Sequence, residues 1–204
     1  MGVKEMTKIM SSDEAIALIK NGNTIAVGGF VGAAHPEELT LKINESFLKK
    51  GVPNDLTLVF AAGQGDSKER GLNHLGEEGL ISKVIGGHFG LSPRLAKLAL
   101  ENKIQAYNLP QGVISHLYRD IAAGKPGTIT HVGLKTFVDP RIEGGKLNDI
   151  TKKDIVEVLS IHDKDYLFYK AFPINVTLLR ATYADESGNA TMEREVVTLD
   201  SLSM

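Results

Sequence analysis

Short apolar runs alternate with amphipathic stretches over the first 124 residues of this 204-residue chain. Four runs rich in aliphatic and β-branched residues have the length of buried strands, and turn-forming residues follow each of them. Between them, apolar residues recur at helical spacing, as Leu39, Ile43 and Phe47 do. We predict strands at residues 24–27, 56–61, 83–87 and 104–109.

Local signals mark the ends of the predicted helices. Ser11 and Glu14 fit a capping box, so a helix is expected to begin there and to stop at residues 21–23. Pro36 suits a helix start, where a missing N–H costs nothing, and Gly51 suits a helix end. The first helix is predicted to bury Ala15, Ile16, Leu18 and Ile19. Further helices are predicted from Ser92 to Leu100 and, after residues 110–112, up to about Gly124.

This alternation of strands and helices predicts an α/β fold with a mostly parallel sheet and helices on both of its faces. Ligands of such sheets bind beyond the carboxyl ends of the strands. We therefore expect functional residues in the loops that follow the strands. These loops are residues 28–36, 63–65, 86–90 and 110–112.

The pattern changes after Pro126, where a small β-rich excursion is predicted over about residues 126–175. It contains a hairpin of residues 155–161 and 166–169, joined by residues 162–165. The apolar run at residues 176–182 is predicted to rejoin the main sheet. Another apolar run at residues 196–199 has neither a cap nor a polar tail after it, so we expect the polypeptide to continue beyond Met204 or to be one piece of a complex.

The composition narrows the possible classes. A net charge of -2 leaves no basic surplus for binding nucleic acid or anionic membranes. The absence of cysteine removes disulfides, thiolate metal ligands and cysteine nucleophiles, and the six histidines show no ligand spacing, so no metal site is expected. No run is long enough to span a bilayer and the N-terminus lacks a secretory signal, so a cytoplasmic location is expected.

A glycine-rich segment of Gly28, Gly29, Phe30, Val31 and Gly32 follows the first predicted strand. Glycine lets the backbone approach a ligand closely and present N–H groups to a carbonyl or carboxylate oxygen. The spacing fits neither a dinucleotide-binding fingerprint nor a P-loop. The pattern alone is therefore compatible with a tight turn as well as with a ligand cradle.

Longer motifs carry a resemblance to a known family. The run NGNTIAVGGFVGAAHP at residues 21–36 resembles the first signature of the family I CoA-transferases, with Ala34 where that family usually carries glycine. YNLPQG at residues 107–112 resembles the segment that places a glutamine beside the bound acyl group. The later motifs GGHFG (86–90), TFVDPR (136–141), GGKLN (144–148) and YADESGN (183–189) resemble those of the long-chain acyl-CoA:acetate or 3-oxoacid (acetate/propionate) CoA-transferases.

The resemblance implies a CoA-transferase-like fold and an N-terminal, α-type domain over residues 1–204, without the catalytic C-terminal half. It implies transfer of CoA between a short-chain acyl-CoA and a free carboxylate such as acetate, by a ping-pong mechanism through a glutamyl-CoA thioester on that other half. CoA is then a substrate, and no cofactor is expected. The implied partners are the acyl-CoA, the carboxylate, a C-terminal half or β-type subunit, and further copies in a homo-oligomer.

The same resemblance implies no catalytic residue in this chain, because the nucleophilic glutamate belongs to the other half. The substrate-binding residues that it implies are Gly28, Gly29, Phe30, Val31, Gly32, Gln111 and Gly112.

Several other polar residues have simpler interpretations. Glu37 and Glu38 are expected to interact with the positive end of the helix that follows Pro36. His88 is expected to be a structural hydrogen bonder, and Arg94 and Lys97 are expected on a solvated helix face.

Two alternatives to the transferase remain open. CoA-ester hydrolases and the α chain of citrate lyase share this architecture with other chemistry, and a stand-alone ligand-binding domain would have no activity.

Overall fold

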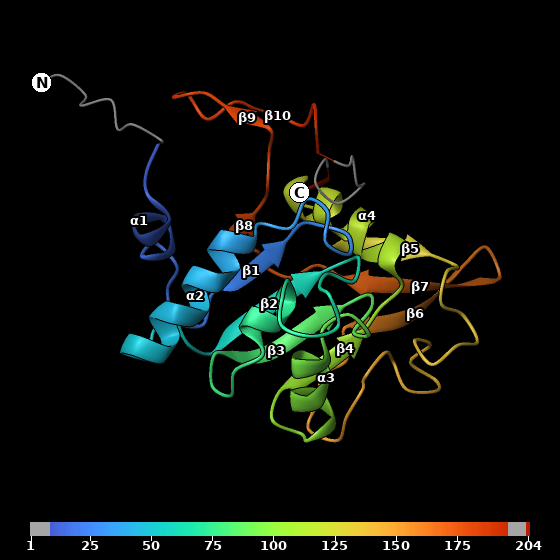
Figure 1. Cartoon of the computed structure of the whole chain (residues 1–204). Helices are drawn as coiled ribbons and strands as arrows, with labels where there is room; N and C mark the ends of the chain where they lie inside the picture. The colour runs from blue at the N-terminus through green and yellow to red at the C-terminus, as the bar shows by residue number, and fades with distance from the viewer. Residues whose placement is uncertain (1–8, 196–202) are drawn as a thin grey trace, which may run out of the picture.

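A five-stranded, entirely parallel sheet forms the centre of the computed structural model, which describes residues 9–195 and 203–204 (Figure 1). The strand order is β4-β3-β2-β1-β8. The five strands are β1 (Thr24–Val27), β2 (Leu56–Phe60), β3 (Ile81–Gly86), β4 (Gln105–Asn108) and β8 (Val176–Leu178). The predicted strands and the return of the chain to the main sheet are thereby confirmed.

Helices cover both faces of the sheet, as predicted. One face packs against α1 (Ser12–Ile16), α2 (Glu37–Lys50), the 3-10 helix η1 (Leu72–Leu75) and α3 (Pro93–Leu100). The other face packs against α4 (Gln111–Ala122) and a second, three-stranded sheet. Alternate residues of each strand enter the two cores because strand side chains point to opposite faces: Ile25 lies in the first core and Ala26 in the second.

Most helix boundaries follow from their capping residues. Ser11 accepts a hydrogen bond from the Glu14 amide, and the Glu14 carboxylate accepts one from the Ser11 amide, which confirms the capping box. Helix α2 begins one residue after Pro36, and it ends at Gly51, whose φ of 71° is the left-handed conformation that glycine favours. Helix α4 begins at Gln111, two residues earlier than expected.

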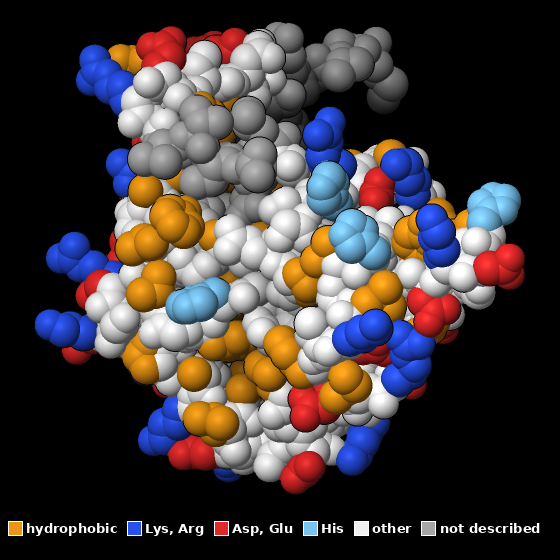
Figure 2. All heavy atoms as spheres, turned by 90° about the vertical axis from the view of Figure 1, so that its right-hand side faces the viewer, with side chains coloured by type: hydrophobic (Ala, Val, Ile, Leu, Met, Phe, Trp, Pro, Cys, Tyr) orange, Lys and Arg blue, Asp and Glu red, His pale blue; other side chains and the backbone are white. Residues whose placement is uncertain are grey.

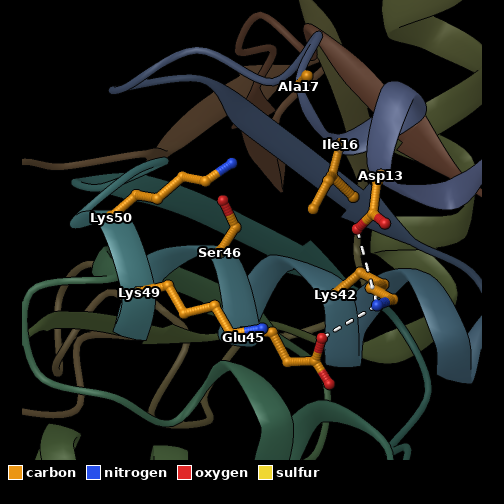
Figure 3. A pocket seen from close by; sticks show the side chains of 8 residues that line it. All are labelled: Asp13, Ile16, Ala17, Lys42, Glu45, Ser46, Lys49 and Lys50. Carbon is orange, nitrogen blue, oxygen red and sulfur yellow. Dashed lines mark hydrogen bonds and ion pairs between the residues drawn. The ribbon is translucent and has the colours of Figure 1, made fainter.

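The first helix is shorter than predicted. It stops after Ile16, so Leu18 leaves the helical pattern and is 65% exposed, whereas Ile19 remains buried. The expectation that Leu18 is buried was wrong, because it extended the helical period beyond the last helical residue. An ion pair between Asp13 and Lys42 (3.7 Å) connects α1 to α2 beside a cavity of about 380 Å³, and Lys42 also pairs with Glu45 of its own helix (3.1 Å) (Figure 3).

The predicted excursion is the second sheet, which has the order β5-β7-β6 and lies beside the main sheet (Figure 1). Its strands are β5 (Gly127–Thr130), β6 (Val156–Ile161) and β7 (Lys164–Lys170), all antiparallel. The hairpin turn consists of His162 and Asp163 alone, both with positive φ (50° and 61°), so the four-residue connection was wrong. β5 was not predicted as a strand.

The ends of the excursion lie side by side. Gly127 pairs with Lys170, and the Ala171 amide donates to the Pro126 carbonyl at 2.8 Å. Inside the excursion, the buried Asp139 carboxylate binds the Arg141 guanidinium, which also pairs with Asp165 of the hairpin.

Hydrophobic side chains occupy the middle of the face seen in Figure 2, with charged residues around its border. The large apolar side chains of the excursion that are at least 38% exposed are Ile129, Val132, Phe137, Ile142, Leu147, Ile150 and Ile161.

A further small hairpin, β9 (Tyr183–Ala184) with β10 (Ala190–Thr191), follows β8, which ends four residues earlier than predicted. The apolar run at residues 196–199 lies outside the described residues. Across residues 9–195 and 203–204, none of the helices has the length and apolar character that crossing a bilayer requires.

Candidate functional site

The predicted loops gather at one edge of the main sheet, beyond the carboxyl ends of β1 to β4. The parallel register aligns these ends: Val59 lies opposite Ala26 and Ile85, and Gly86 lies opposite Phe60 and Asn108. The glycine-rich segment therefore lies at the end of β1 and Gln111 at the end of β4, with the loops after β2 and β3 between them. This is the edge at which parallel sheets bind ligands.

The glycine-rich segment forms a tight turn that is anchored to its neighbour. Phe30 and Ala33 exchange two backbone hydrogen bonds (3.0 and 2.9 Å). The Val31 amide donates to the Gly63 carbonyl, and the Val31 carbonyl accepts from the Gly65 amide, both at 2.8 Å. Backbone groups of Val31 thus hold the turn against the loop after β2.

Backbone strain accompanies this turn. Val31 has a φ of 57° and Ala34 has a φ of 55°, in the left-handed region that side chains with a Cβ avoid. A β-branched residue such as valine is particularly unfavourable there. Strain of this kind often occurs where a loop geometry is required for function.

The turn offers fewer backbone donors than the sequence suggested. The amides of Gly28, Phe30 and Val31 donate to protein carbonyls, so three of the predicted donors are already occupied. Within the described part of the chain, the amides of Gly29 and Gly32 have no hydrogen-bond acceptor. The side chains of Phe30 and Val31 are 49% and 43% exposed and give this edge an apolar rim.

A buried polar network supports the turn from below. The Gln64 side chain is completely buried, and its amide nitrogen donates to the Val27 carbonyl at 2.8 Å. Its Oε1 lies 2.6 Å from Nδ1 of His35, which is 2% exposed. An amide oxygen only accepts, so Nδ1 of His35 carries a proton. Nε2 of His35 lies 2.9 Å from the Thr40 hydroxyl.

Burial lowers the pKa of the His35 imidazole, although its bond to Gln64 and the nearby Glu37 carboxylate act in the opposite direction. The neutral imidazole keeps its proton on Nδ1 and accepts from Thr40 through Nε2. Protonation of Nε2 would turn the Thr40 hydroxyl toward the Glu37 carbonyl, which lies 3.1 Å away.

The two acidic residues at the start of α2 have structural partners. Glu37 accepts from Nε2 of His74 at 2.8 Å and from the Gly71 amide at 3.1 Å. Glu38 accepts from the Ser12 hydroxyl at 2.7 Å. The expectation of structural rather than catalytic roles agrees with these contacts.

Gln111 is the first residue of α4, and its side chain is exposed. No other side chain or backbone group in the described residues forms a hydrogen bond with its amide group. The helix can begin so close to the sheet because Gly87 has no side chain: a Cβ there would lie 2.1 Å from the Ala61 carbonyl oxygen and 3.2 Å from the Gln111 Cα. The space around Gly112 is open. Gln111 therefore presents free donors at the positive end of α4.

Sequence reasoning missed two features of this edge. Gln64 was part of a loop of interest but was not proposed as a site residue, although its position between two glycines after a buried strand was a usable signal. A cavity of about 490 Å³ lies beside the turn and contains two arginines, Arg180 and Arg194. Nε of Arg180 pairs with Glu195 at 3.1 Å. Nothing in the local sequence pattern indicated these arginines.

The remaining candidates do not form a site. The exposed His88 ring packs over Gly63 and has no hydrogen-bond partner in the described ranges, so the expected structural hydrogen bond is not found. Arg94 pairs with Glu77, whereas Lys97 is exposed and lies 3.8 Å from Glu101. Among the described residues, no three His, Asp or Glu side chains lie close enough together to hold a metal ion.

Comparisons with known proteins identify one enzyme family. The family model for coenzyme A transferase matches residues 9–204. A caffeate CoA-transferase of Acetobacterium woodii is 46% identical over 93% of this chain and 36% of its own length. The acetate CoA-transferase subunit alpha of Escherichia coli is 30% identical over 92% of this chain and 76% of that subunit.

Among solved structures, the acyl-CoA transferase apoenzyme of Escherichia coli O157:H7 has a TM-score of 0.95 and 39% identity, over 98% of this chain and 39% of that one. The chain thus spans well under half of the length of the caffeate CoA-transferase and of this acyl-CoA transferase.

Proposed function

Because the chain belongs to the coenzyme A transferase family, we propose that it is the N-terminal, α-type part of an enzyme that moves CoA between a short-chain acyl-CoA and a free carboxylate such as acetate. Residues 1–204 then supply the acyl-binding edge. A C-terminal half or a β-type subunit supplies the nucleophile.

The reaction proceeds in two balanced halves. A glutamate of the other half attacks the thioester carbonyl, the C–S bond breaks, and an acyl–glutamyl anhydride and CoA thiolate form. The thiolate then attacks the glutamyl carbonyl of the anhydride, which gives the glutamyl-CoA thioester and releases the donor carboxylate. The acceptor carboxylate reverses these steps and leaves as the new acyl-CoA, so no oxidant or added proton is needed.

The unpartnered amide of Gln111 is the observation that carries this proposal. During each attack, negative charge develops on a carbonyl oxygen, and a fixed N–H donor stabilises it. Gln111 offers two N–H donors at the positive end of α4, at the edge where the strands end. Phe30 and Val31 form the apolar wall beside the acyl chain, and their 49% and 43% exposure leaves them available for contact.

The names of two relatives support a β-type partner and suggest a wider range of acyl groups. The relative of Escherichia coli is named as a subunit alpha, which supports a β-type partner for this chain. The relative of Acetobacterium woodii is named for caffeate, an aromatic acid, so we propose aromatic acids as alternative acceptors. Assembly into a homo-oligomer stays a prediction.

The test combines the chain with its C-terminal half or β-type subunit and supplies propionyl-CoA and acetate. We expect acetyl-CoA to form, and borohydride treatment during turnover should inactivate the enzyme at a glutamate outside residues 1–204. Gln111→Ala should lower kcat by about a hundredfold, the size of the loss when one oxyanion donor is removed. Arg119→Ala, on an exposed position of the same helix, is the matched control.

Two outcomes would contradict the proposal. A trapped carboxylate within residues 1–204 would place the nucleophile in this chain. Release of free CoA at the same rate without acetate would identify a CoA-ester hydrolase instead.

A further inference from the structure

A third cavity, of about 230 Å³, lies between the two sheets and reaches the amino ends of β1 and β2. Its floor is formed by Thr24 and Thr57 at the amino ends of β1 and β2, by Lys83 and Ile85 of β3 and by Tyr107 of β4. Thr24 and Thr57 are paired in register on β1 and β2, and Thr57 is paired with Lys83 on β3. Lys153 and Ile155 of the segment before β6, Lys170 at the end of β7 and the following residues 171–173 form the rest of the wall. The cavity is thus built from both sheets.

The lining of this cavity is strongly basic. Three lysines, Lys83, Lys153 and Lys170, line it together with Thr24 and Thr57, and no acidic residue does so among the described residues. Two acidic residues close in sequence to the lining residues are already paired: Asp154 binds Lys146 at 2.5 Å, and Glu157 binds Lys170. Within the described residues, neither Lys83 nor Lys153 has an acidic partner within 4 Å.

The ammonium group of Lys83 belongs to a side chain that is partly buried. Lys83 and Ile85 are two residues apart on β3 and therefore share a face, and Ile85 is buried in the second core. The Lys83 side chain is thus partly buried between two sheets rather than directed to open solvent. An ammonium group in such a place is stabilised by an anion.

The cavity is also rigid. The Tyr107 hydroxyl donates to the Lys153 carbonyl at 2.8 Å and fixes the backbone of that wall. Burial raises the pKa of Tyr107, so this hydroxyl keeps its proton. The Lys170 amide donates to the Ile155 carbonyl at 2.9 Å and ties β7 to the segment before β6.

The cavity between α1 and α2 provides a contrast (Figure 3). Lys42 there is already paired with both Asp13 and Glu45, two acidic residues of the lining. Lys49 and Lys50 also line that cavity, but its two carboxylates would repel an incoming anion. Of these two cavities of the described residues, the one between the sheets has unpaired lysines and no acidic lining.

We propose that the cavity between the sheets binds a small organic carboxylate, with its oxygens on Lys83 and Lys153 and its hydrocarbon part against Ile155 and Phe172. Charged hydrogen bonds to the two ammonium groups hold the carboxylate. The apolar wall favours a short hydrocarbon chain over an inorganic oxyanion, which would leave that wall in contact with water. This second site is separate from the acyl-binding edge and does not depend on the proposed transfer reaction.

The test is a titration of the ¹⁵N-labelled chain with sodium butyrate, followed by amide chemical shifts. We expect saturable shifts at Thr57 and Lys83, at the cavity, that follow a single binding curve. Lys83→Met and Lys153→Met should each weaken this binding at least about tenfold, because each removes a charged hydrogen bond. Lys152→Met is the matched control: it removes an exposed neighbouring lysine that does not line the cavity, and it should leave the affinity unchanged.

Two further ligands test separately whether the site requires the negative charge and whether it prefers an organic ligand. Butyramide, which has the same chain without the charge, should not shift Thr57 or Lys83, and inorganic phosphate should bind more weakly than butyrate. The proposal is overturned if butyrate gives no saturable shift at these amides or if both lysine variants bind it as tightly as the native chain. Phosphate binding as tight as that of butyrate would overturn the assignment to an organic carboxylate. Dispersed spectra of the variants verify that each is folded.

Discussion

Replacement of Gln64 by leucine tests how much the buried network contributes to the stability of the glycine-rich turn. Leucine has a similar length but neither a donor nor an acceptor. The substitution removes the bond from the Gln64 amide to the Val27 carbonyl (2.8 Å) and the bond that Gln64 accepts from Nδ1 of His35 (2.6 Å). Both Gln64 and His35 are almost completely buried, so water cannot replace these bonds without a rearrangement.

The magnitude follows from the two groups left behind. A buried donor or acceptor without a partner costs about 1–3 kcal/mol, so the free energy of unfolding should fall by about 2–6 kcal/mol. Burial of the leucine side chain offsets part of this cost and favours the lower half of the range. Since the total stability of a domain is about 5–15 kcal/mol, the loss is a large fraction of it.

Urea unfolding followed by far-UV circular dichroism measures this loss. Gln111→Leu is the matched control, since its exposed side chain has no partner among the described residues and its cost should stay within about 0.5 kcal/mol. If Gln64→Leu and Gln111→Leu cost the same within error, the network does not stabilise the turn and the reasoning is refuted.

Other substitutions test the strain, the close packing and the titration near the same edge. Val31→Asn should raise stability by about 1 kcal/mol in thermal unfolding, because asparagine tolerates a φ of 57° better than valine, whereas the same change at the equally exposed Val132 should not. Gly87→Ala should lower the free energy of unfolding by more than about 3 kcal/mol or prevent folding, since its Cβ would lie 2.1 Å from a carbonyl oxygen. Gly112→Ala is the control: the space around Gly112 is open, so the change should be neutral or stabilising by up to about 1 kcal/mol. Burial lowers the pKa of His35 in the folded state, so the unfolded chain takes up a proton at this residue at a higher pH than the folded chain does. The free energy of unfolding should therefore fall as the pH drops below about 6.5, by at most about 1.4 kcal/mol per pH unit. A pH series of urea titrations checks this, and an equal fall in His35→Gln would contradict it.

The parts of the fold that depend on local pattern could be predicted from the sequence. The apolar runs of β1 to β4 and the glycine residues after them gave the parallel sheet and its ligand-binding edge, because strand burial and glycine conformation are local properties. The capping box at Ser11 and the glycine at the end of α2 were confirmed for the same reason. The assignment of Leu18 failed because the apolar spacing continues past the point where the helical hydrogen bonds stop.

Properties that depend on pairing across the fold could not be predicted. β5 consists of Gly127–Thr130 and is a strand only because β7 lies beside it. The bond between His35 and Gln64 joins residues 29 positions apart, and no spacing rule indicates it. The same applies to the cavity between the sheets, since Lys83 and Lys153 come from elements that meet only after folding.

The hydrogen bond between Ala171 and Pro126 joins the two ends of the excursion. This segment therefore has two distinct roles, as a connection and as a cover. As a connection, the excursion is dispensable: its ends already meet, so a short turn would suffice to lead the chain from α4 toward β8. As a cover, it is not dispensable, because Val156, Leu167 and Tyr169 bury one face of the main sheet. A version of this fold with a trimmed excursion would therefore keep its strand order but would need another surface, such as a neighbouring subunit, over the same face.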